Sequence, residues 1–228
     1  MIERGAFVRG VRRSLGICAV VAGFGVLYGV VATAAGMPGW LAVASSFVVL
    51  SGAAQFTLAA LLGIGAGPGA LIVAASGLAL RHLPMAAALR PFLEPADGAK
   101  RALMAYVLTD ETFGLTLVAA QAGEERPGDF LLGANAALLT GWAGGTAIGV
   151  VFGAVIDPAA LGLALLLPLL FLGLAGDHLH DARHLVVSAI AIAASALAVV
   201  FVPGPWRITA AAFATAAVAA LFPWSGGE

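Results

Sequence analysis

Eight apolar runs follow one another along this chain of 228 residues, and each is long enough to cross a lipid bilayer. Only 10% of the residues are charged, whereas soluble domains carry about 25%. A surface with so few charges cannot face water, and in lipid the backbone must satisfy its own hydrogen bonds, as a helix does. The sequence therefore predicts an all-α, polytopic membrane helical bundle. The runs are 14–36, 41–64, 68–91, 102–122, 130–156, 159–176, 185–202 and 206–222.

Composition also excludes several other kinds of site. The formal net charge is −1 and the sequence contains no basic face, so we expect no nucleic-acid partner. Cys18 is the single cysteine, which excludes an intramolecular disulfide and a thiolate metal site. The polar segment 177–184 contains Asp and His residues, but their spacing fits no zinc motif and predicts a solvated loop. We therefore expect neither a metal nor a cofactor.

The charge pattern divides the chain into a basic N-terminal arm, residues 1–13, and a single integral membrane domain, residues 14–224. The arm carries four arginines against one acid, Glu3, so the positive-inside rule places it in the cytoplasm. The first apolar run is too long for the core of a cleaved signal peptide, and we expect it to be retained. The arginines are Arg4, Arg9, Arg12 and Arg13.

The charges of the loops restrict the number of crossings. Eight simple crossings would put Lys100 and Arg101 outside and the acidic loop 123–129 inside, against the positive-inside bias. The contradiction goes away if one run within 41–91 enters and leaves on the same side, because seven crossings then remain. Re-entrant backbone is tolerated where protein or a wet cavity covers it. The sequence predicts seven or eight transmembrane segments with one broken or re-entrant helix.

Charged side chains stand inside two of the apolar runs. Charge at membrane depth costs a few kcal/mol or more, so it is rarely placed there without a use. Asp110 lies nine residues beyond Arg101, or about 14 Å along a helix, which is close to the middle of a hydrocarbon core about 30 Å thick. Arg81 is also far from Pro68, where its run begins. We expect the cation of one helix to meet the carboxylates of another.

Each of these polar side chains has more than one interpretation. Arg81 either snorkels to an interface or forms an intramembrane ion pair or anion contact. His82 either relays protons or hydrogen-bonds within the bundle. Asp110 and Glu111 point about 100° apart, so one can pair with Arg81 while the other lines a cavity, where it would bind an ammonium group or carry a coupling proton. Gln55 makes either a helix–helix hydrogen bond or a substrate contact.

Pro84 predicts a helix break in the third run. Proline has no N–H, so the Leu80 carbonyl loses its helical partner. We expect a kinked or interrupted helix there, with free carbonyls and a new helix N-terminus, because such helices form the binding sites of many secondary transporters. In the first run, Gly25 and Gly29 form a small-xxx-small pair that allows another helix to approach closely.

Four short motifs occur in order over residues 15–120, and their combination is specific although any one alone is weak. With them the chain resembles the AzlC family, the large subunit of bacterial branched-chain amino acid exporters. The second half is similar in hydropathy and around residues 142–145. The motifs are Gly25-Val26-Leu27-Tyr28-Gly29, Ser51-Gly52-Ala53-Ala54-Gln55-Phe56, Leu80-Arg81-His82 with Leu89-Arg90-Pro91-Phe92-Leu93, and Leu108-Thr109-Asp110-Glu111-Thr112-Phe113.

The resemblance implies a secondary transporter rather than an enzyme. Such a transporter exports leucine, isoleucine, valine and often methionine across the bacterial inner membrane. The resemblance also implies a small AzlD-type membrane subunit as partner and coupling to the proton gradient. The residues suit a zwitterion with an apolar tail. Arg81 or the helix start after Pro84 could bind the carboxylate, and Asp110 or Glu111 could bind the ammonium or carry the proton. Phe56 could line the pocket for the tail. A channel for a small solute and a non-transporting scaffold for a small membrane subunit are the alternatives.

Overall fold

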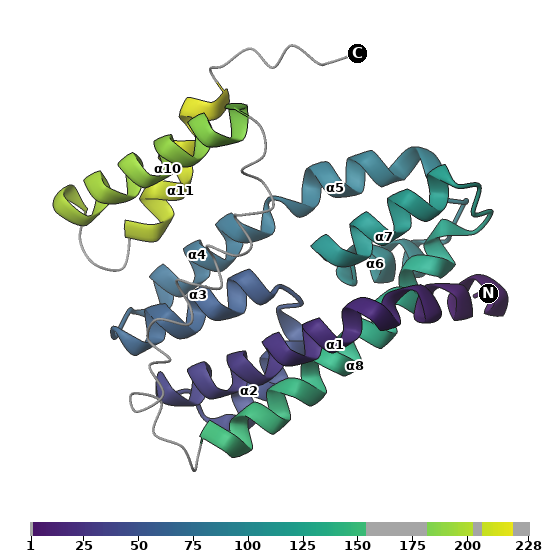
Figure 1. The fold of residues 1–228 in the computed structure, drawn as a ribbon, viewed down its shortest axis with the longest axis horizontal. Coiled ribbons are helices and arrows are strands. Elements are labelled where there is room, and N and C mark those ends of the chain that lie inside the picture. Colours follow the sequence, from purple (N-terminus) through teal and green to yellow (C-terminus); the bar gives the residue numbers. More distant parts are fainter. Residues whose placement is uncertain (1, 154–181, 203–206, 221–228) are drawn as a thin grey trace.

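The computed structural model describes residues 2–153, 182–202 and 207–220, and every regular element in these ranges is a helix (Figure 1). The all-α prediction is therefore confirmed for the described part of the chain. The sixth apolar run, 159–176, and most of the polar segment 177–184 fall outside it. The helices are α1 (Arg4–Ala34), α2 (Gly39–Val48), α3 (Gly52–Gly63), α4 (Pro68–Ala79), α5 (His82–Leu89), η1 (Arg90–Phe92), α6 (Gly98–Tyr106), α7 (Asp110–Gln121), α8 (Pro127–Gly153), α10 (Ala182–Phe201) and α11 (Arg207–Ala220).

Among the described residues, three helical segments are long and apolar enough to cross a membrane: Arg4–Ala34, Pro68–Phe92 and Pro127–Gly153. A fourth is added if the bent pair α6–α7 counts as one span. These segments agree with the predicted helical membrane protein, whereas the count of seven or eight crossings stays a prediction. α10 and α11 pack against each other beside α4, where Phe213 of α11 lies against Gly77 (Figure 1).

Helices α1 and α8 run parallel and in contact along their length (Figure 1). The contact depends on glycines, because a Cβ on Gly25 would overlap the Trp142 carbonyl and a Cβ on Gly29 would overlap the Thr146 carbonyl. Glycines of α8 meet the α1 backbone in the same way, as Gly149 does at Val26. The predicted close approach at Gly25 and Gly29 is confirmed, and the partner helix is α8.

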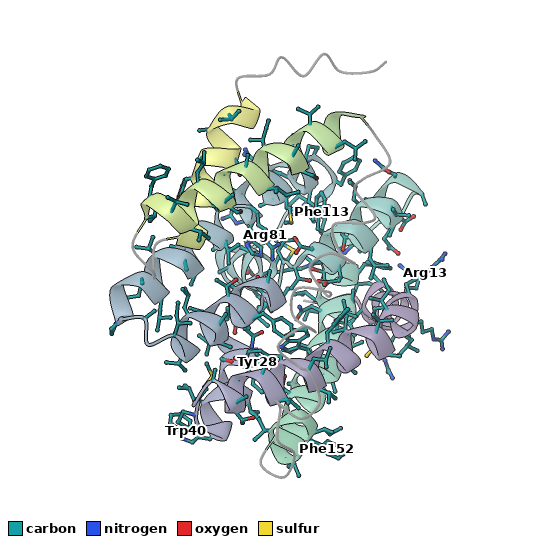
Figure 2. All side chains as sticks on the ribbon, turned by 60° about the vertical axis from the view of Figure 1, so that its left-hand side comes forward. Arg13, Tyr28, Trp40, Arg81, Phe113 and Phe152 are labelled. Atoms are coloured by element: carbon teal, nitrogen blue, oxygen red, sulfur yellow. The ribbon has the colours of Figure 1, made fainter. Side chains whose placement is uncertain are left out.

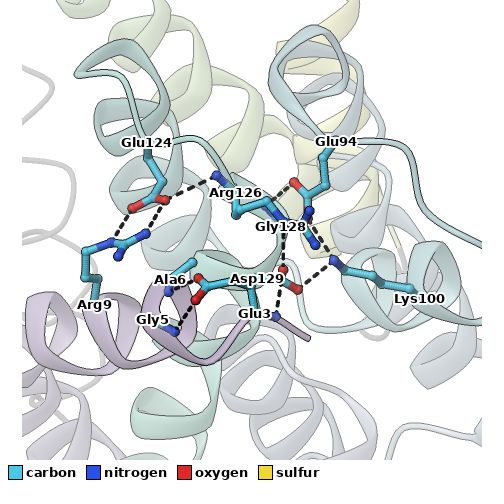
Figure 3. A network of polar contacts seen from close by, with 10 residues as sticks. All are labelled: Glu3, Gly5, Ala6, Arg9, Glu94, Lys100, Glu124, Arg126, Gly128 and Asp129. Carbon is cyan, nitrogen blue, oxygen red and sulfur yellow. Dashed lines mark hydrogen bonds and ion pairs between the residues drawn. The ribbon is translucent and has the colours of Figure 1, made fainter. Parts of the chain in front are cut away.

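Charged residues gather where α1 and α8 begin, and we call this the charged end of the bundle (Figure 3). At its centre lies Asp129, which is fully buried. Lys100 Nζ lies 2.6 Å from Asp129 Oδ1, and the Glu3 amide donates to Oδ2 at 3.1 Å. Arg126 Nε is 3.3 Å from the same Oδ2. The start of α1, the start of α6 and the start of α8 are thus held together.

Two further carboxylates complete the charged end. Burial raises the pKa of Glu94, but the hydrogen bonds from Lys100 Nζ at 2.8 Å and from the Gly128 amide at 3.0 Å outweigh it, so the pKa lies below the ordinary value. Arg9 donates to both oxygens of Glu124, at 2.8 and 2.7 Å, and these bonds hold the pKa of Glu124 below its usual range.

The fourth apolar run, 102–122, is a hairpin rather than a crossing. Lys100 at the start of α6 and Glu124 after α7 both lie at the charged end, and the two helices are bent by 120° between them. The expectation that this run crosses the membrane, which put Lys100 and the loop 123–129 on opposite sides, is therefore wrong. The physical reason is local: Thr109 begins a new helix instead of continuing the old one.

The second apolar run, 41–64, is also a hairpin, and it enters from the opposite end. Its helices α2 and α3 are separated at 49–51, where Leu50 takes a φ of 44°. Gly39 at the start of α2 packs on Val150, and Gly63 at the end of α3 packs on Ala35, so both ends of the run lie where α1 and α8 finish. These contacts agree with the expectation of one re-entrant run within 41–91, and the number of crossings stays a prediction.

The third run carries the chain from that opposite end back to the charged end. Its helix is interrupted at Leu80 and Arg81, just before Pro84, as the missing proline N–H predicts. The prediction of a free carbonyl is wrong, because the Leu80 oxygen accepts from the Leu83 amide at 3.1 Å. The interruption is mild, and Pro68–Phe92 still qualifies as one span.

Span and hairpin therefore alternate in two units of opposite direction. The first unit is α1 with the α2–α3 hairpin, and the second is α4–α5 with the α6–α7 hairpin. The tips of the hairpins meet inside the bundle, where the Tyr106 hydroxyl donates to the Phe47 carbonyl. Buried apolar clusters cover both hairpins, one around Tyr28 and Phe56 and the other around Met104 and Leu131.

Candidate functional site

Arg81 joins the tips of the two hairpins near the middle of the bundle (Figure 2). Its Nη1 lies 2.9 Å from Asp110 Oδ2 at the start of α7, and its Nη2 donates to Ser51 Oγ at 2.8 Å, at the start of α3. The guanidinium, whose side chain is 34% exposed, thus contacts two helix ends, which favours the ion-pair interpretation over snorkelling. The expected meeting of a cation with a carboxylate from another segment is present.

A cavity of about 480 Å³ lies around this contact. All five side chains that the sequence singled out line it, namely Gln55, Arg81, His82, Asp110 and Glu111, and their roles stay predictions. The rest of the wall is apolar or small. It is formed by Val21, Phe24, Ser46, Leu50, Ser51, Gly52, Ala53, Phe56, Thr109, Asn135, Leu138, Leu139 and Trp142.

The two carboxylates of the cavity differ in their partners. Asp110 and Glu111 are the first residues of α7 and both line the cavity. Asp110 pairs with Arg81, whereas Glu111 is exposed and has no ion pair among the described residues. Glu111 is therefore the carboxylate that is free to take a ligand cation or a proton.

The start of α3 offers unpaired donors on the same cavity. The Ser51 hydroxyl caps the Ala54 amide, but the amides of Gly52 and Ala53 meet no acceptor among the described residues. The first turn of α3 contains no acid, unlike that of α7. A helix N-terminus carries about half a positive charge, so the start of α3 is a place for an anion, next to Arg81.

Gln55 makes the expected helix–helix hydrogen bond, and its contact with a substrate stays a prediction. It is almost fully buried, and its Nε2 donates to Ser45 Oγ at 3.0 Å, which links α3 to α2. Its Oε1 has no hydrogen-bond partner in the described structure. The amide nitrogen thus makes the helix–helix bond, and the oxygen remains for another contact.

His82, the first residue of α5, is held by the last residue of α4. Its Nδ1 lies 2.9 Å from the Ala79 carbonyl oxygen, so the tautomer that satisfies this contact has its proton on Nδ1. The other ring nitrogen, Nε2, is then an acceptor at the cavity wall. Proton relay by His82 stays a prediction.

Sequence reasoning missed the residues that shape the bend between α6 and α7. Thr109 caps α7, with hydrogen bonds in both directions between Thr109 and Thr112. Asn135 of α8 donates to the Val107 carbonyl at 3.0 Å, which satisfies an oxygen freed by the bend. The pattern Thr109-Asp110-Glu111-Thr112 was a usable signal, because a threonine followed by acids marks a helix start. Nothing in the sequence pointed to Asn135.

The described residues contain no group of three or more His, Cys, Asp or Glu side chains arranged to hold a metal ion. The segment 177–184, which has suitable residue types, falls largely outside them.

Comparison with known proteins agrees with this architecture. A family profile described as AzlC protein matches residues 16–156, which span α1 to the end of α8 and include every residue of the cavity wall. No curated protein and no solved structure matched the chain. The match covers more than half of the chain, and the protein is thus a member of the AzlC family of transport-related membrane proteins.

Proposed function

We propose that the chain is the large subunit of a secondary exporter that moves leucine, isoleucine, valine and also methionine across the bacterial inner membrane. The proposal includes coupling to the proton gradient and a small AzlD-type partner subunit. Its support is the transport-related family together with one observation, the cavity in which Arg81 joins two broken helices. Interrupted helices at membrane depth are where secondary transporters hold their substrates.

The substrate carboxylate binds at the start of α3. The free amides of Gly52 and Ala53 point their dipoles there, and the Arg81 guanidinium lies beside them on Ser51. Backbone amides and a guanidinium together form a strong anion site where water is scarce. This assignment replaces the helix start expected after Pro84, because α5 begins at His82 and Pro84 lies in its first turn.

The substrate ammonium binds at the start of α7. Glu111 has no ion pair among the described residues, and Asp110 is shared with Arg81. Glu111 also serves as the group that carries the coupling proton, because a carboxylate cannot hold a proton and an ammonium at once. Competition between the two ions for one carboxylate couples their movement.

The apolar tail lies against the remaining wall of the cavity. This wall is formed by Val21 and Phe24 of α1, Leu138 and Leu139 of α8, and Phe56 of α3. A hydrophobic pocket discriminates by about 1–3 kcal/mol for each methylene, so several aliphatic amino acids pass. The charged end faces the cytoplasm, because the arginines of the N-terminal arm lie there.

The test is efflux of preloaded labelled leucine and methionine from cells that express the chain with its small partner subunit. Arg81→Ala and Asp110→Asn are expected to reduce efflux to background while the protein still assembles in the membrane. Efflux that does not saturate would favour a channel. Normal assembly without efflux from the wild type, or full efflux from both variants, would contradict the proposal.

A further inference from the structure

Three of the residues that line the cavity each carry a buried polar atom with no hydrogen-bond partner in the described structure. Arg81 Nε and, on α8, Trp142 Nε1 are donors, and Gln55 Oε1 on α3 is an acceptor. Buried polar groups in proteins are hydrogen-bonded in the large majority of cases, so each such exception calls for an explanation. Unpaired atoms of opposite kind on one cavity are explained together by a ligand.

The position of Trp142 is fixed by its neighbours. Its ring stacks on Tyr28 with centroids 6.0 Å apart and meets the edge of Phe56 at 6.2 Å. Its benzene edge lies over Gly52, so that a Cβ there would be 2.8 Å from the ring. The indole is thus packed against the start of α3, beside the unpaired amides of Gly52 and Ala53.

The Gln55 amide is oriented by hydroxyl groups around its nitrogen. Gln55 Nε2 donates to Ser45 Oγ at 3.0 Å and lies 3.4 Å from Ser46 Oγ. Ser45 Oγ in turn lies 2.7 Å from the Tyr28 hydroxyl. In this orientation Gln55 Oε1 is the amide atom without a partner.

We infer that Trp142 donates its indole N–H to the substrate carboxylate and that Gln55 Oε1 accepts from the substrate ammonium. The inference rests on the proposed function, in which the ligand is an aliphatic amino acid. The assignment follows from chemistry: the indole can only donate, and the carboxylate is the only acceptor of such a ligand. Likewise, the ammonium is its only donor to Gln55.

The test compares leucine with two fragments of it on the full chain purified in detergent with its small partner subunit. Isoamylamine lacks the carboxylate, and 4-methylpentanoate lacks the ammonium. Trp142→Phe keeps an aromatic ring and removes the N–H. We expect it to weaken leucine and 4-methylpentanoate about tenfold or more and to leave isoamylamine unchanged, since one hydrogen bond to a charged group is lost. Gln55→Met is expected to weaken leucine and isoamylamine and to spare 4-methylpentanoate.

Trp40→Phe is the matched control, because Trp40 is 73% exposed on α2 and lies outside the cavity. It should leave all three affinities unchanged. Equal leucine binding by the wild type and Trp142→Phe would overturn the inference and leave the proposed function standing. Equal weakening of all three ligands would overturn it too, because a packing defect acts on every ligand.

A second measurement does not depend on the folding of Trp142→Phe. In a variant with Trp40, Trp206 and Trp224 changed to Phe, Trp142 is the sole tryptophan. Leucine should shift its fluorescence emission, and isoamylamine should not. Bound labelled leucine without any emission shift would overturn the inference. Absence of leucine binding by the wild type would instead remove the proposed function, and the inference with it.

Discussion

Arg81 and Asp110 come from different membrane segments and form an ion pair in which Nη1 lies 2.9 Å from Oδ2. The same guanidinium donates to Ser51 at 2.8 Å, so one side chain fixes the starts of two helices. A fork of donors can serve two acceptors at once, and a single ammonium in its place cannot do so with the same geometry.

Arg81→Lys is therefore expected to reduce leucine efflux roughly tenfold although the charge is kept, which corresponds to the loss of one charge-assisted hydrogen bond. Initial efflux rates, corrected for the amount of protein in the membrane, measure the effect. Arg90→Lys is the matched control, because Arg90 is exposed and has no ion pair among the described residues. Equal rates for Arg81→Lys and the wild type would show that the two-point contact is dispensable.

The hairpin topology predicts which positions share a side of the membrane. In a Cys18→Ser background, Ala99→Cys and Glu125→Cys should react with an impermeant maleimide from the same side as the N-terminal arm, because the ends of α6–α7 both lie at the charged end. Gly67→Cys, before α4, should react from the opposite side. Labelling of intact cells and of everted vesicles shows from which side each cysteine is accessible. If positions 99 and 125 react from opposite sides, the run 102–122 crosses the membrane and the hairpin is wrong.

The glycine contact between α1 and α8 predicts a position-dependent effect of one methyl group. Gly25→Ala and Gly29→Ala should each destabilise the protein by about 1–3 kcal/mol, because the added Cβ overlaps the α8 backbone. Gly23→Ala is on the same helix with open space around it, and the better helix propensity of alanine should stabilise it by up to about 1 kcal/mol. Thermal unfolding in detergent compares the three variants. A similar loss at position 23 would mean that helix contact is not the cause.

Acid should weaken the charged end. The pKa of Glu94 lies below its ordinary value of 4.5, so its contribution to stability is complete above about that pH and is lost as the pH falls through the lowered value. Glu94→Gln should therefore lower the melting temperature near neutral pH, on the order of 2–4 °C for 1 kcal/mol, and the difference should shrink on acidification below pH 4.5. Glu125→Gln, an exposed residue with no ion pair among the described residues, is the control. A difference that stays constant down to acid pH would exclude the carboxylate as its source.

The site was more predictable from the sequence than the path of the chain. Charged residues such as Arg81 and Asp110 stand out in apolar runs, because burying a charge costs free energy. A charge kept there despite that cost indicates a functional residue even when the fold is unknown. The sequence carries no comparable signal for whether an apolar run crosses the membrane or turns back. Hydropathy measures length and polarity, so two helices of 9 and 12 residues joined by a bend give the same profile as one span.

The roles of Trp142 and Asn135 could not be predicted from the sequence. Each is a single polar or aromatic residue in a glycine-rich run, and its role depends on which helix faces it. Asn135 matters because the Val107 carbonyl is 3.0 Å away, and Trp142 because Gly52 leaves room for its ring. Such relationships arise only when α8 is placed beside the hairpins.

The starts of α3 and α7 both lie at the cavity, and their dipoles contribute to its net charge. The starts of α3 and α7 each contribute about half a positive charge, Arg81 adds one, and the Asp110 and Glu111 carboxylates remove two, so the charges of these groups cancel. A zwitterion preserves this neutrality as it enters and leaves, whereas a lone cation or anion adds net charge at membrane depth. Under the proposed function, the movement of the amino acid would then carry no net charge, and the membrane potential would act on the coupling proton alone.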